Sequence, residues 1–392
     1  MADVFTSTTK TSYWSRLWNA LKWIIGWFVL LWASIFLLWW NENNYVEQKA
    51  ALDETKWLTV ETTADAINPD LDWQVVYVSW KTSSPSEEAL VDELFWVKTD
   101  DLKLIRNVEM YQWIEEQTSD TEDNLWWSQT TTTKYTYHKE WSSDEIDSSN
   151  FEHPQDHENP VWNFHSETYT KDPIMLGVYD ITQTFGDRLD DTKSLNLSGQ
   201  EIREQSGMII SDYNIYIWND ANKPEVWDMR IKFETLKPGT VSVVAEQHAD
   251  SLRAHTTKNG RNISLISESD TSIDWLFDAA YSSNTMLTWL LRFVGILWLW
   301  LWFSMIFSIF EALAKIIPFL WNLVWWAVGL VCLGLALIVW LTTIAIAWLV
   351  VRPVIWLSVL AVVIIVIVWM VTLKKRKWWA VKSDKDVEII EA

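Results

Sequence analysis

The chain has 392 residues, which is enough for two or three domains of ordinary size. Its 31 basic and 52 acidic residues give a net charge of −21, and most of the acidic residues fall between positions 41 and 290. A general nucleic-acid binder needs cationic surface to displace counterions from phosphate, so this balance excludes nucleic acid as a partner. The single cysteine, Cys332, excludes an intrachain disulfide and a cysteine-based zinc cluster.

Tryptophan occurs 32 times and glycine 10 times, whereas a chain of this length with average composition would hold roughly 27 glycines. The pairs Trp126-Trp127 and Trp378-Trp379 stand in polar stretches, where chain chemistry favours flexible residues. We therefore expect many tryptophans to occupy positions built for glycine, and these two pairs to be exposed or at a bilayer interface. The alternative is a naturally Trp-rich membrane protein with aromatic belts at both membrane surfaces.

The first apolar run, residues 23–40, predicts a transmembrane helix after a short cytosolic segment at 1–22. It holds 18 residues without a charge, about 27 Å as a helix, which is close to the thickness of the hydrocarbon core. A cleaved signal peptide is the competing interpretation. However, the run exceeds a usual h-region, and the following residues 41–44 offer no small-residue cleavage site. We expect an uncleaved anchor.

The long loop at 41–290 predicts an exported β-rich domain. Alternating side chains at 108–113 and 131–138 predict two strands that pair as a hairpin across a polar connection. Similar patterns predict further strands at 74–78, 213–218, 226–234 and 240–246, and weaker helical patterns at 87–95 and 272–280.

Three further apolar runs follow the loop. They predict transmembrane helices at 293–310, 327–350 and 353–373, an interfacial helix at 316–326, and a basic-acidic cytosolic tail at 374–392. Lysines and arginines flank the first and last runs, so the positive-inside rule places both termini in the cytosol or nucleoplasm. The predicted fold is a multi-pass α-helical membrane protein with four spans, one N-terminal and three C-terminal, and a large α+β extramembrane domain.

The order of short motifs along the chain resembles the transmembrane protein 43 family. The matching positions run from the end of the first apolar run to the last predicted hairpin and comprise Asn41-Glu42, Arg106-Asn107-Val108-Glu109-Met110-Tyr111-Gln112-Trp113, Glu140-Trp141, Asn159-Pro160, Pro224-Glu225, Asp228, Arg230 and Arg352-Pro353. The family carries glycine where this chain has Trp57, Trp73, Trp80, Trp96 and Trp227. That departure supports the hypothesis that tryptophans replace glycines, which we call the substitution hypothesis. It also leaves the backbone conformation at these positions unpredicted.

The resemblance implies a function in membrane organisation. Eukaryotic members of the family are found in the endoplasmic reticulum and inner nuclear membrane, self-associate, and help organise the nuclear envelope; prokaryotic relatives also exist. For this chain the resemblance implies a bilayer, further copies of itself and other membrane or envelope proteins as partners. It predicts the endoplasmic reticulum or inner nuclear membrane in a eukaryote, and the inner membrane in a bacterium.

Residue patterns for catalysis or metal binding are weak. His153 and His157 have a spacing that would place both rings on one face of a helix, but Pro154 and Pro160 argue against a helix there. We therefore predict a solvated loop, no metal and no cofactor. The sequence shows no nucleophile elbow, no Walker loop and no dinucleotide-binding motif, so no catalytic residue is predicted.

Charges at the membrane boundary are the remaining functional candidates, because ionisable groups are costly in a bilayer. Glu311 and Lys315 are four residues apart and can pair on a helix, whereas Arg292 and Arg352 are expected to extend toward lipid phosphates. The leading hypothesis is a non-enzymatic membrane scaffold that self-associates. The alternative is a membrane-embedded enzyme or an ion- or lipid-handling component that uses these charges.

Overall fold

The computed structural model describes residues 3–11, 13–123, 129–204, 207–218, 223–314 and 318–351. The chain divides into a β-rich unit, Met1–Lys22 with Ala51–Tyr281, and a helical unit, Trp23–Ala50 with Ser282–Ala392. Several predicted features lie outside the described residues: Trp126-Trp127, Lys315, Arg352-Pro353, the predicted span at 353–373, Trp378-Trp379 and the tail at 374–392. The side chain of Glu311 is also not described.

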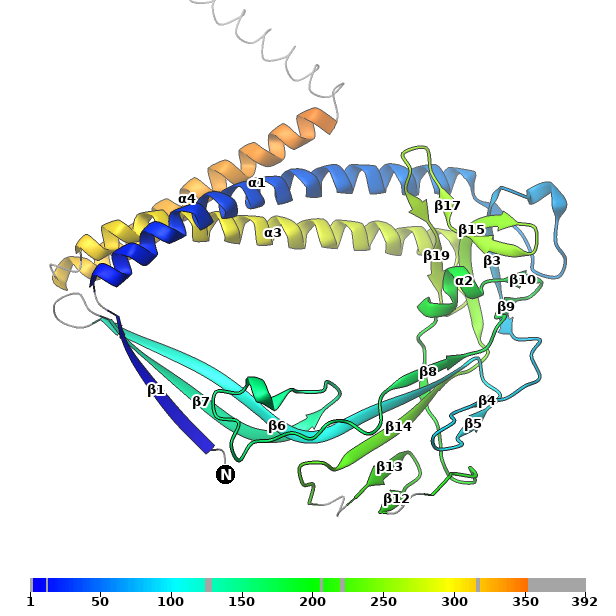
Figure 1. The fold of residues 1–392 in the computed structure, drawn as a ribbon. Coiled ribbons are helices and arrows are strands. Elements are labelled where there is room, and N and C mark those ends of the chain that lie inside the picture. Colours follow the sequence, from blue (N-terminus) through cyan, green and yellow to red (C-terminus); the bar gives the residue numbers. More distant parts are fainter. Residues whose placement is uncertain are drawn as a thin grey trace, which may run out of the picture. The chain divides into compact units, whose positions relative to one another are not determined.

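Three long helices carry the apolar runs (Figure 1). They are α1 (Tyr13–Leu58), α3 (Ile273–Ala314) and α4 (Pro318–Val351). Within the described ranges, two stretches are long and apolar enough to cross a membrane, namely Ile273–Phe307 and Ala327–Trp348. The prediction of four spans is therefore wrong.

The first predicted span, residues 23–40, lies within α1, which continues without a break into the polar residues 41–44. It is not one of the two stretches found in the described residues, and the side chains of residues 23–27 lie outside them. The predicted interfacial helix at 316–326 and the predicted span at 327–350 fall within one helix, α4, which is continuous from Pro318.

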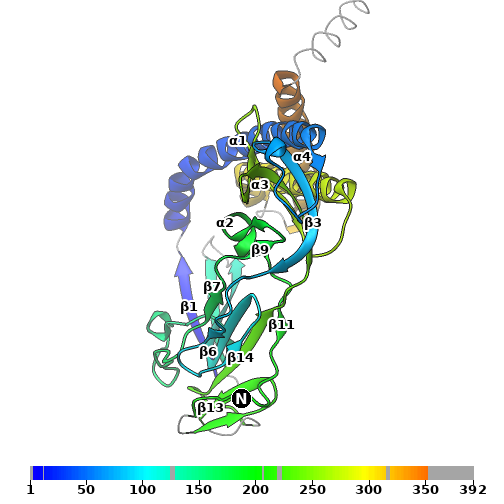
Figure 2. The same ribbon diagram turned by 90° about the vertical axis from the view of Figure 1, so that its right-hand side faces the viewer.

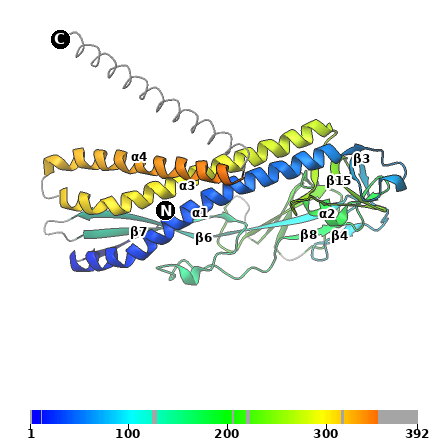
Figure 3. The same ribbon diagram turned by 90° about the horizontal axis from the view of Figure 1, so that it is seen from above.

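The helical unit has a small apolar core of its own. Leu38 of α1, Leu299 of α3 and Ala336 of α4 are fully buried against one another. Gly295 permits this close approach, because a Cβ at that position would lie 2.5 Å from Cδ2 of Leu38. Figure 3 shows α3 and α4 running alongside each other.

The first sheet of the β-rich unit has eight strands in the order β1-β7-β6-β14-β13-β12, with β8 on β6 and β11 on β14 (Figure 2). The strands are β1 (Asp3–Thr11), β6 (Lys103–Asp123), β7 (Gln129–Ser142), β8 (Glu167–Thr170), β11 (Lys193–Ser194), β12 (Met208–Ile210), β13 (Asn214–Ile217) and β14 (Met229–Leu236). The predicted hairpin forms between β6 and β7, with Glu115 opposite Tyr137. It is longer than predicted, because the polar stretch up to Asp123 continues the ladder.

The second sheet closes on itself through a pairing between β3 and β15. Its strands are β2 (Val60–Glu61), β3 (Val75–Ser83), β9 (Met175–Leu176), β10 (Tyr179–Asp180), β15 (Thr240–His248), β16 (Ser251–Arg253) and β19 (Leu265–Ser267). A buried apolar cluster that includes Val76, Tyr179 and Val243 supports it. The shorter elements are β4 (Leu90–Val91), β5 (Lys98–Thr99), β17 (His255–Thr256), β18 (Asn262–Ile263), α2 (Thr182–Phe185) and three single turns, η1 (Pro69–Leu71), η2 (Ser148–Asn150) and η3 (Gly186–Arg188).

The helix predicted at 87–95 does not form. The segment contains the short strand β4 and then a turn in which Oδ1 of Asp92 accepts hydrogen bonds from the backbone N–H groups of Leu94 and Phe95. A side-chain carboxylate that caps nearby N–H groups competes with the helical ladder and favours a turn. The helix predicted at 272–280 does form, as the first turns of α3.

Four tryptophans have the backbone conformation of glycine. The described residues with positive φ other than glycine number six, and four of them are Trp73 (φ 63°), Trp96 (φ 60°), Trp218 (φ 85°) and Trp227 (φ 97°). Each backbone N–H donates to a carbonyl: that of Trp96 closes a turn with Asp92 at 2.7 Å, and the other three reach carbonyls that are distant in sequence. A left-handed backbone is costly for any residue with a Cβ and free for glycine. The substitution hypothesis therefore gains support from backbone geometry.

We predict that replacing these four tryptophans with glycine stabilises the protein. Each change relieves about 1–2 kcal/mol of backbone strain, since glycine adopts positive φ without a steric clash. Trp73, Trp96 and Trp227 are more than half exposed, so little packing is lost. The measurement is the midpoint of thermal unfolding of the full chain in detergent. Trp162→Gly is the matched control and should lower the midpoint, because Trp162 is buried in the core.

Candidate functional site

The family motif at residues 106–113 lies on β6 and contributes one member of a buried ion pair in the first sheet. Arg106 and Asp92 are almost fully buried, and Nη1 of Arg106 donates to Oδ2 of Asp92. The guanidinium also donates from Nη2 to Glu167 at 2.8 Å and from Nε to the carbonyl of His165 at 2.9 Å. The other oxygen of Asp92 accepts from the N–H of Phe95 at 2.8 Å. Both charges are thus paired and hydrogen-bonded, which is the condition for burying them.

A second set of motif charges joins β6 to β14. Glu109 lies opposite Arg230, and its Oε2 accepts from Nε of Arg230 at 2.7 Å and lies 3.3 Å from Nζ of Lys232. The guanidinium of Arg230 also lies 4.6 Å from the ring centre of Trp141, in a cation–π contact. Because these charges are partly exposed, water screens them and each pair contributes less than the buried one.

The Pro224-Glu225 motif forms a turn that Asp228 fixes to β6. Asp228 is fully buried, and its carboxylate accepts from the N–H of Glu225 at 2.8 Å and from the hydroxyl of Tyr216. The carbonyl of Asp228 accepts from the N–H of Tyr111 at 2.9 Å. The motif therefore sets the start of β14 against the string on β6.

Asn159 and Gln112 hold the loop after β7 against β6. Oδ1 of Asn159 accepts from the N–H of Trp113 at 2.7 Å, and its Nδ2 donates to the carbonyls of Trp113 and Ile146 at 2.9 and 3.2 Å. The buried Gln112 donates to the carbonyl of Asp144. Of the remaining motif positions, Val108 and Met110 are core residues, and Glu140 lies opposite Gln112 on β7.

His157 is buried, so the prediction of a solvated loop is wrong for this residue. Its ring stacks on Tyr137 with 4.0 Å between centroids, its Nδ1 lies 3.0 Å from the carbonyl of His153, and its Nε2 lies 3.5 Å from the carboxylate of Asp3. Burial, and then a hydrogen bond to Glu115, raise the pKa of Tyr137 to about 12. Across the described residues, no three His, Cys, Asp or Glu side chains converge as metal ligands would.

The helical unit contains a buried ion pair of its own. Glu42 is fully buried, and Arg292 donates from Nε to Oε1 at 2.6 Å and from Nη2 to Oε2 at 2.8 Å. Nε1 of Trp348 donates to Oε2 of Glu42 at 2.6 Å, and Nε1 of Trp340 donates to the carbonyl of Arg292 at 3.1 Å. Arg292 was expected to extend toward lipid phosphates. The structure instead directs it toward α1, because the carboxylate of Glu42 binds the guanidinium in a bidentate manner.

Two amides extend this contact along α1 and α3. Nδ2 of the buried Asn41 donates to the carbonyl of Thr288 at 3.1 Å, and Nδ2 of Asn284 donates to the carbonyl of Tyr45 at 3.2 Å. The Asn41-Glu42 motif therefore joins α1 to α3, and Trp348 adds α4. The structure does not test the predicted Glu311–Lys315 pair or the role of Arg352, whose side chains it does not describe.

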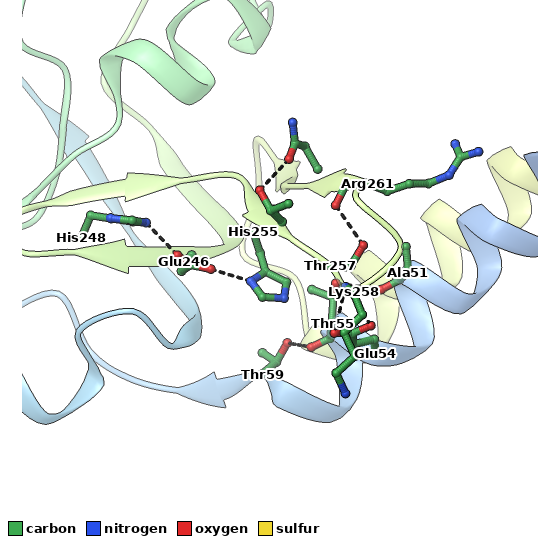
Figure 4. Close-up of polar contacts among 12 residues, drawn as sticks. Ala51, Glu54, Thr55, Thr59, Glu246, His248, His255, Thr257, Lys258 and Arg261 are labelled. Carbon is green, nitrogen blue, oxygen red and sulfur yellow. Dashed lines mark hydrogen bonds and ion pairs between the residues drawn. The ribbon is translucent and has the colours of Figure 1, made fainter.

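Sequence reasoning missed the partners of these charges. Asp92 fell in a predicted helix, Glu167 in an unassigned stretch, and Trp348 inside an apolar run. It also missed a cluster in which Oε1 of Glu246 lies 2.7 Å from His248 and Oε2 lies 2.5 Å from His255 (Figure 4). Apart from Glu246 and His248, which lie two residues apart on β15, these partners come from separate elements that the fold brings together, so no spacing signals the contacts.

The fold and these contacts define a class: a membrane protein with a large β-rich extramembrane domain, braced by buried ion pairs. The family model described as Transmembrane protein 43 matches residues 110–353, which is more than half of the chain. The chain therefore belongs to the transmembrane protein 43 family, as its motifs indicated.

Three relatives show how far the similarity extends. The chain is 31% identical over 289 residues to transmembrane protein 43 of Homo sapiens, which covers 69% of this chain and 70% of the relative. It is 30% identical over 278 residues to the protein of Mus musculus, covering 67% and 68%. It is 27% identical over 274 residues to the homolog of Drosophila melanogaster, covering 68% and 71%. No solved structure matches the chain.

Removing one member of the Arg106–Asp92 pair should destabilise the protein strongly. Arg106→Met or Asp92→Asn should each cost about 3–5 kcal/mol, because a buried charge loses its partner. Glu109→Gln on the same strand is the matched control and should cost about 0–1 kcal/mol, since its pairs are screened by water. Urea unfolding of the full chain in detergent measures both. Equal costs at the two sites would contradict the distinction.

The Glu42–Arg292 pair should show strong coupling in a double-mutant cycle. Glu42→Gln and Arg292→Met should each cost about 3–5 kcal/mol, because each strands the opposite charge in a buried site. The double variant should cost less than the sum of the two, since neither charge remains. Thermal unfolding in lipid nanodiscs supplies the four values. Additive costs would show that the two side chains do not pair.

Proposed function

We propose that the chain is an integral membrane scaffold that self-associates and binds other membrane or envelope proteins through its β-rich domain. The observation that carries this proposal is the use made of the family-motif residues. Arg106, Glu109, Asp228 and Glu42 each direct their charge to partners within the chain. These motif residues thus brace the chain itself, Arg106, Glu109 and Asp228 within the β-rich unit and Glu42 within the helical unit.

The buried Glu42–Arg292 pair bears on the alternative, a membrane-embedded enzyme or ion-handling component. An ionisable pair within apolar helices is a usual mark of such a site. Here, however, both carboxylate oxygens accept hydrogen bonds, from Arg292 and from Trp348. A carboxylate whose oxygens are bound by its own helices serves to join those helices, which favours the scaffold.

The proposal predicts that the full chain in lipid nanodiscs or detergent is an oligomer. Light scattering coupled to size-exclusion chromatography should give a protein mass at a multiple of 46.1 kDa. Two differently tagged copies expressed together should also purify together, whereas copies mixed after separate purification serve as the control for detergent-induced association. A monomeric mass at micromolar concentration, together with failure to co-purify, would refute self-association.

A further inference from the structure

Among the described residues, the first sheet of the β-rich unit ends at β1, and no further strand pairs with its outer edge. β1 pairs with β7 over nine consecutive residue pairs, from Asp3 opposite Tyr137 to Thr11 opposite Gln129. Within the described parts of the chain, β7 is the strand that β1 pairs with. An edge strand presents a row of backbone N–H and C=O groups that can pair with another strand. A nine-residue edge is long for such an exposed position.

β1 lacks the features that usually protect an edge strand. The sequence Asp3–Thr11 contains no proline, and the unbroken ladder to β7 shows no bulge. Natural edges are commonly blocked by prolines, bulges or several lysines. β1 carries one lysine, Lys10, and one acidic residue, Asp3, so the strand is neutral in a chain of net charge −21.

The strand is also held in place before any partner arrives. The ring of Phe5 lies 4.5 Å from that of His153 and 5.8 Å from that of Tyr137, and the carboxylate of Asp3 lies 3.5 Å from His157. A preorganised edge loses little conformational entropy when a second strand pairs with it. The open side of β1 is therefore a ready template for strand addition.

We propose that β1 pairs with β1 of a second copy, antiparallel, about a two-fold axis that passes through Ser7. This inference rests on the proposed self-association and names the surface that would carry it. In this register all nine residues pair, with Thr6 opposite Thr8 of the second copy. Asp3 lies opposite Thr11 and Lys10 opposite Val4, so no two like charges face each other.

Charge and symmetry favour a second copy over an unrelated partner. Two copies that each carry −21 repel one another over most of their surfaces, and a neutral strand offers a point of approach with little repulsion. A two-fold interface uses the same strand from both copies, which is the commonest arrangement in soluble homo-oligomers. The pairing would join two eight-stranded sheets into one continuous sheet.

A single cysteine on the proposed axis tests the register directly. In a Cys332→Ala background, Ser7→Cys places two thiols opposite each other across the interface, and mild oxidation should give a disulfide-linked dimer. Lys10→Cys is the matched control: three residues off the axis, its two copies lie roughly 20 Å apart, beyond the reach of a disulfide. Full-length chains in nanodiscs are resolved on non-reducing gels. Equal crosslinking at both positions would overturn the register.

A charge-swap pair tests the energetics. Thr6→Glu with Thr8→Glu places like charges opposite each other twice in the dimer, and should weaken self-association about tenfold. Thr6→Glu with Thr8→Lys places opposite charges there and should restore it. Within one copy, position 6 faces Lys134 and position 8 faces Thr132, so neither variant sets like charges against β7.

The outcomes separate this inference from the proposed function. A wild-type chain that is monomeric refutes both. A wild-type oligomer that both charge variants leave unchanged refutes the β1 interface and leaves the scaffold in place. A loss of association in both charge variants, with no disulfide at Ser7→Cys, also refutes the β1 interface.

Discussion

Strand β6 is the element on which the first sheet depends, because β7, β8 and β14 all pair with it. A strand in that position must either be apolar or supply a partner for every polar group that it buries. β6 buries Arg106, and the partners come from three separate places: the turn at Asp92, the loop at His165 and strand β8 at Glu167. A single guanidinium therefore joins segments that are distant in sequence.

The helical unit meets the same constraint with different chemistry. Glu42 lies at the end of an apolar run, where a sequence pattern suggests the edge of a membrane, yet the side chain is fully buried. Arg292 and Trp348 satisfy its two oxygens. Close packing accompanies this polar contact, because a Cβ at position 295 would lie 2.5 Å from Cδ2 of Leu38, and the side chain or the helix would have to shift.

The sequence predicted the elements that are determined by the local pattern of apolar and polar residues. Alternating side chains at 108–113 and 131–138 identified the β6–β7 hairpin, because alternation with a period of two residues is typical of a strand with one buried face. The motif string identified Arg106 and Glu109, but nothing near Asp92 or Glu167 marked them as partners, since such contacts are decided by the fold. The number of spans was wrong: the apolar runs predicted four, and the described residues contain two stretches long and apolar enough to cross a membrane. Arg292 was misplaced because its buried partner, Glu42, comes from a different helix.

The amino-acid composition and the backbone geometry lead to the same conclusion about the tryptophans. Their excess and the shortage of glycine come from the sequence, whereas the positive φ of Trp73, Trp96, Trp218 and Trp227 comes from the backbone. Adaptation to a membrane would place tryptophan at interfaces and has no reason to place it in left-handed turns. Replacement of glycine accounts for both observations. Glycine remains at other left-handed positions, such as Gly177 at φ 62°, so the replacement hypothesis applies to some glycine positions and not to all.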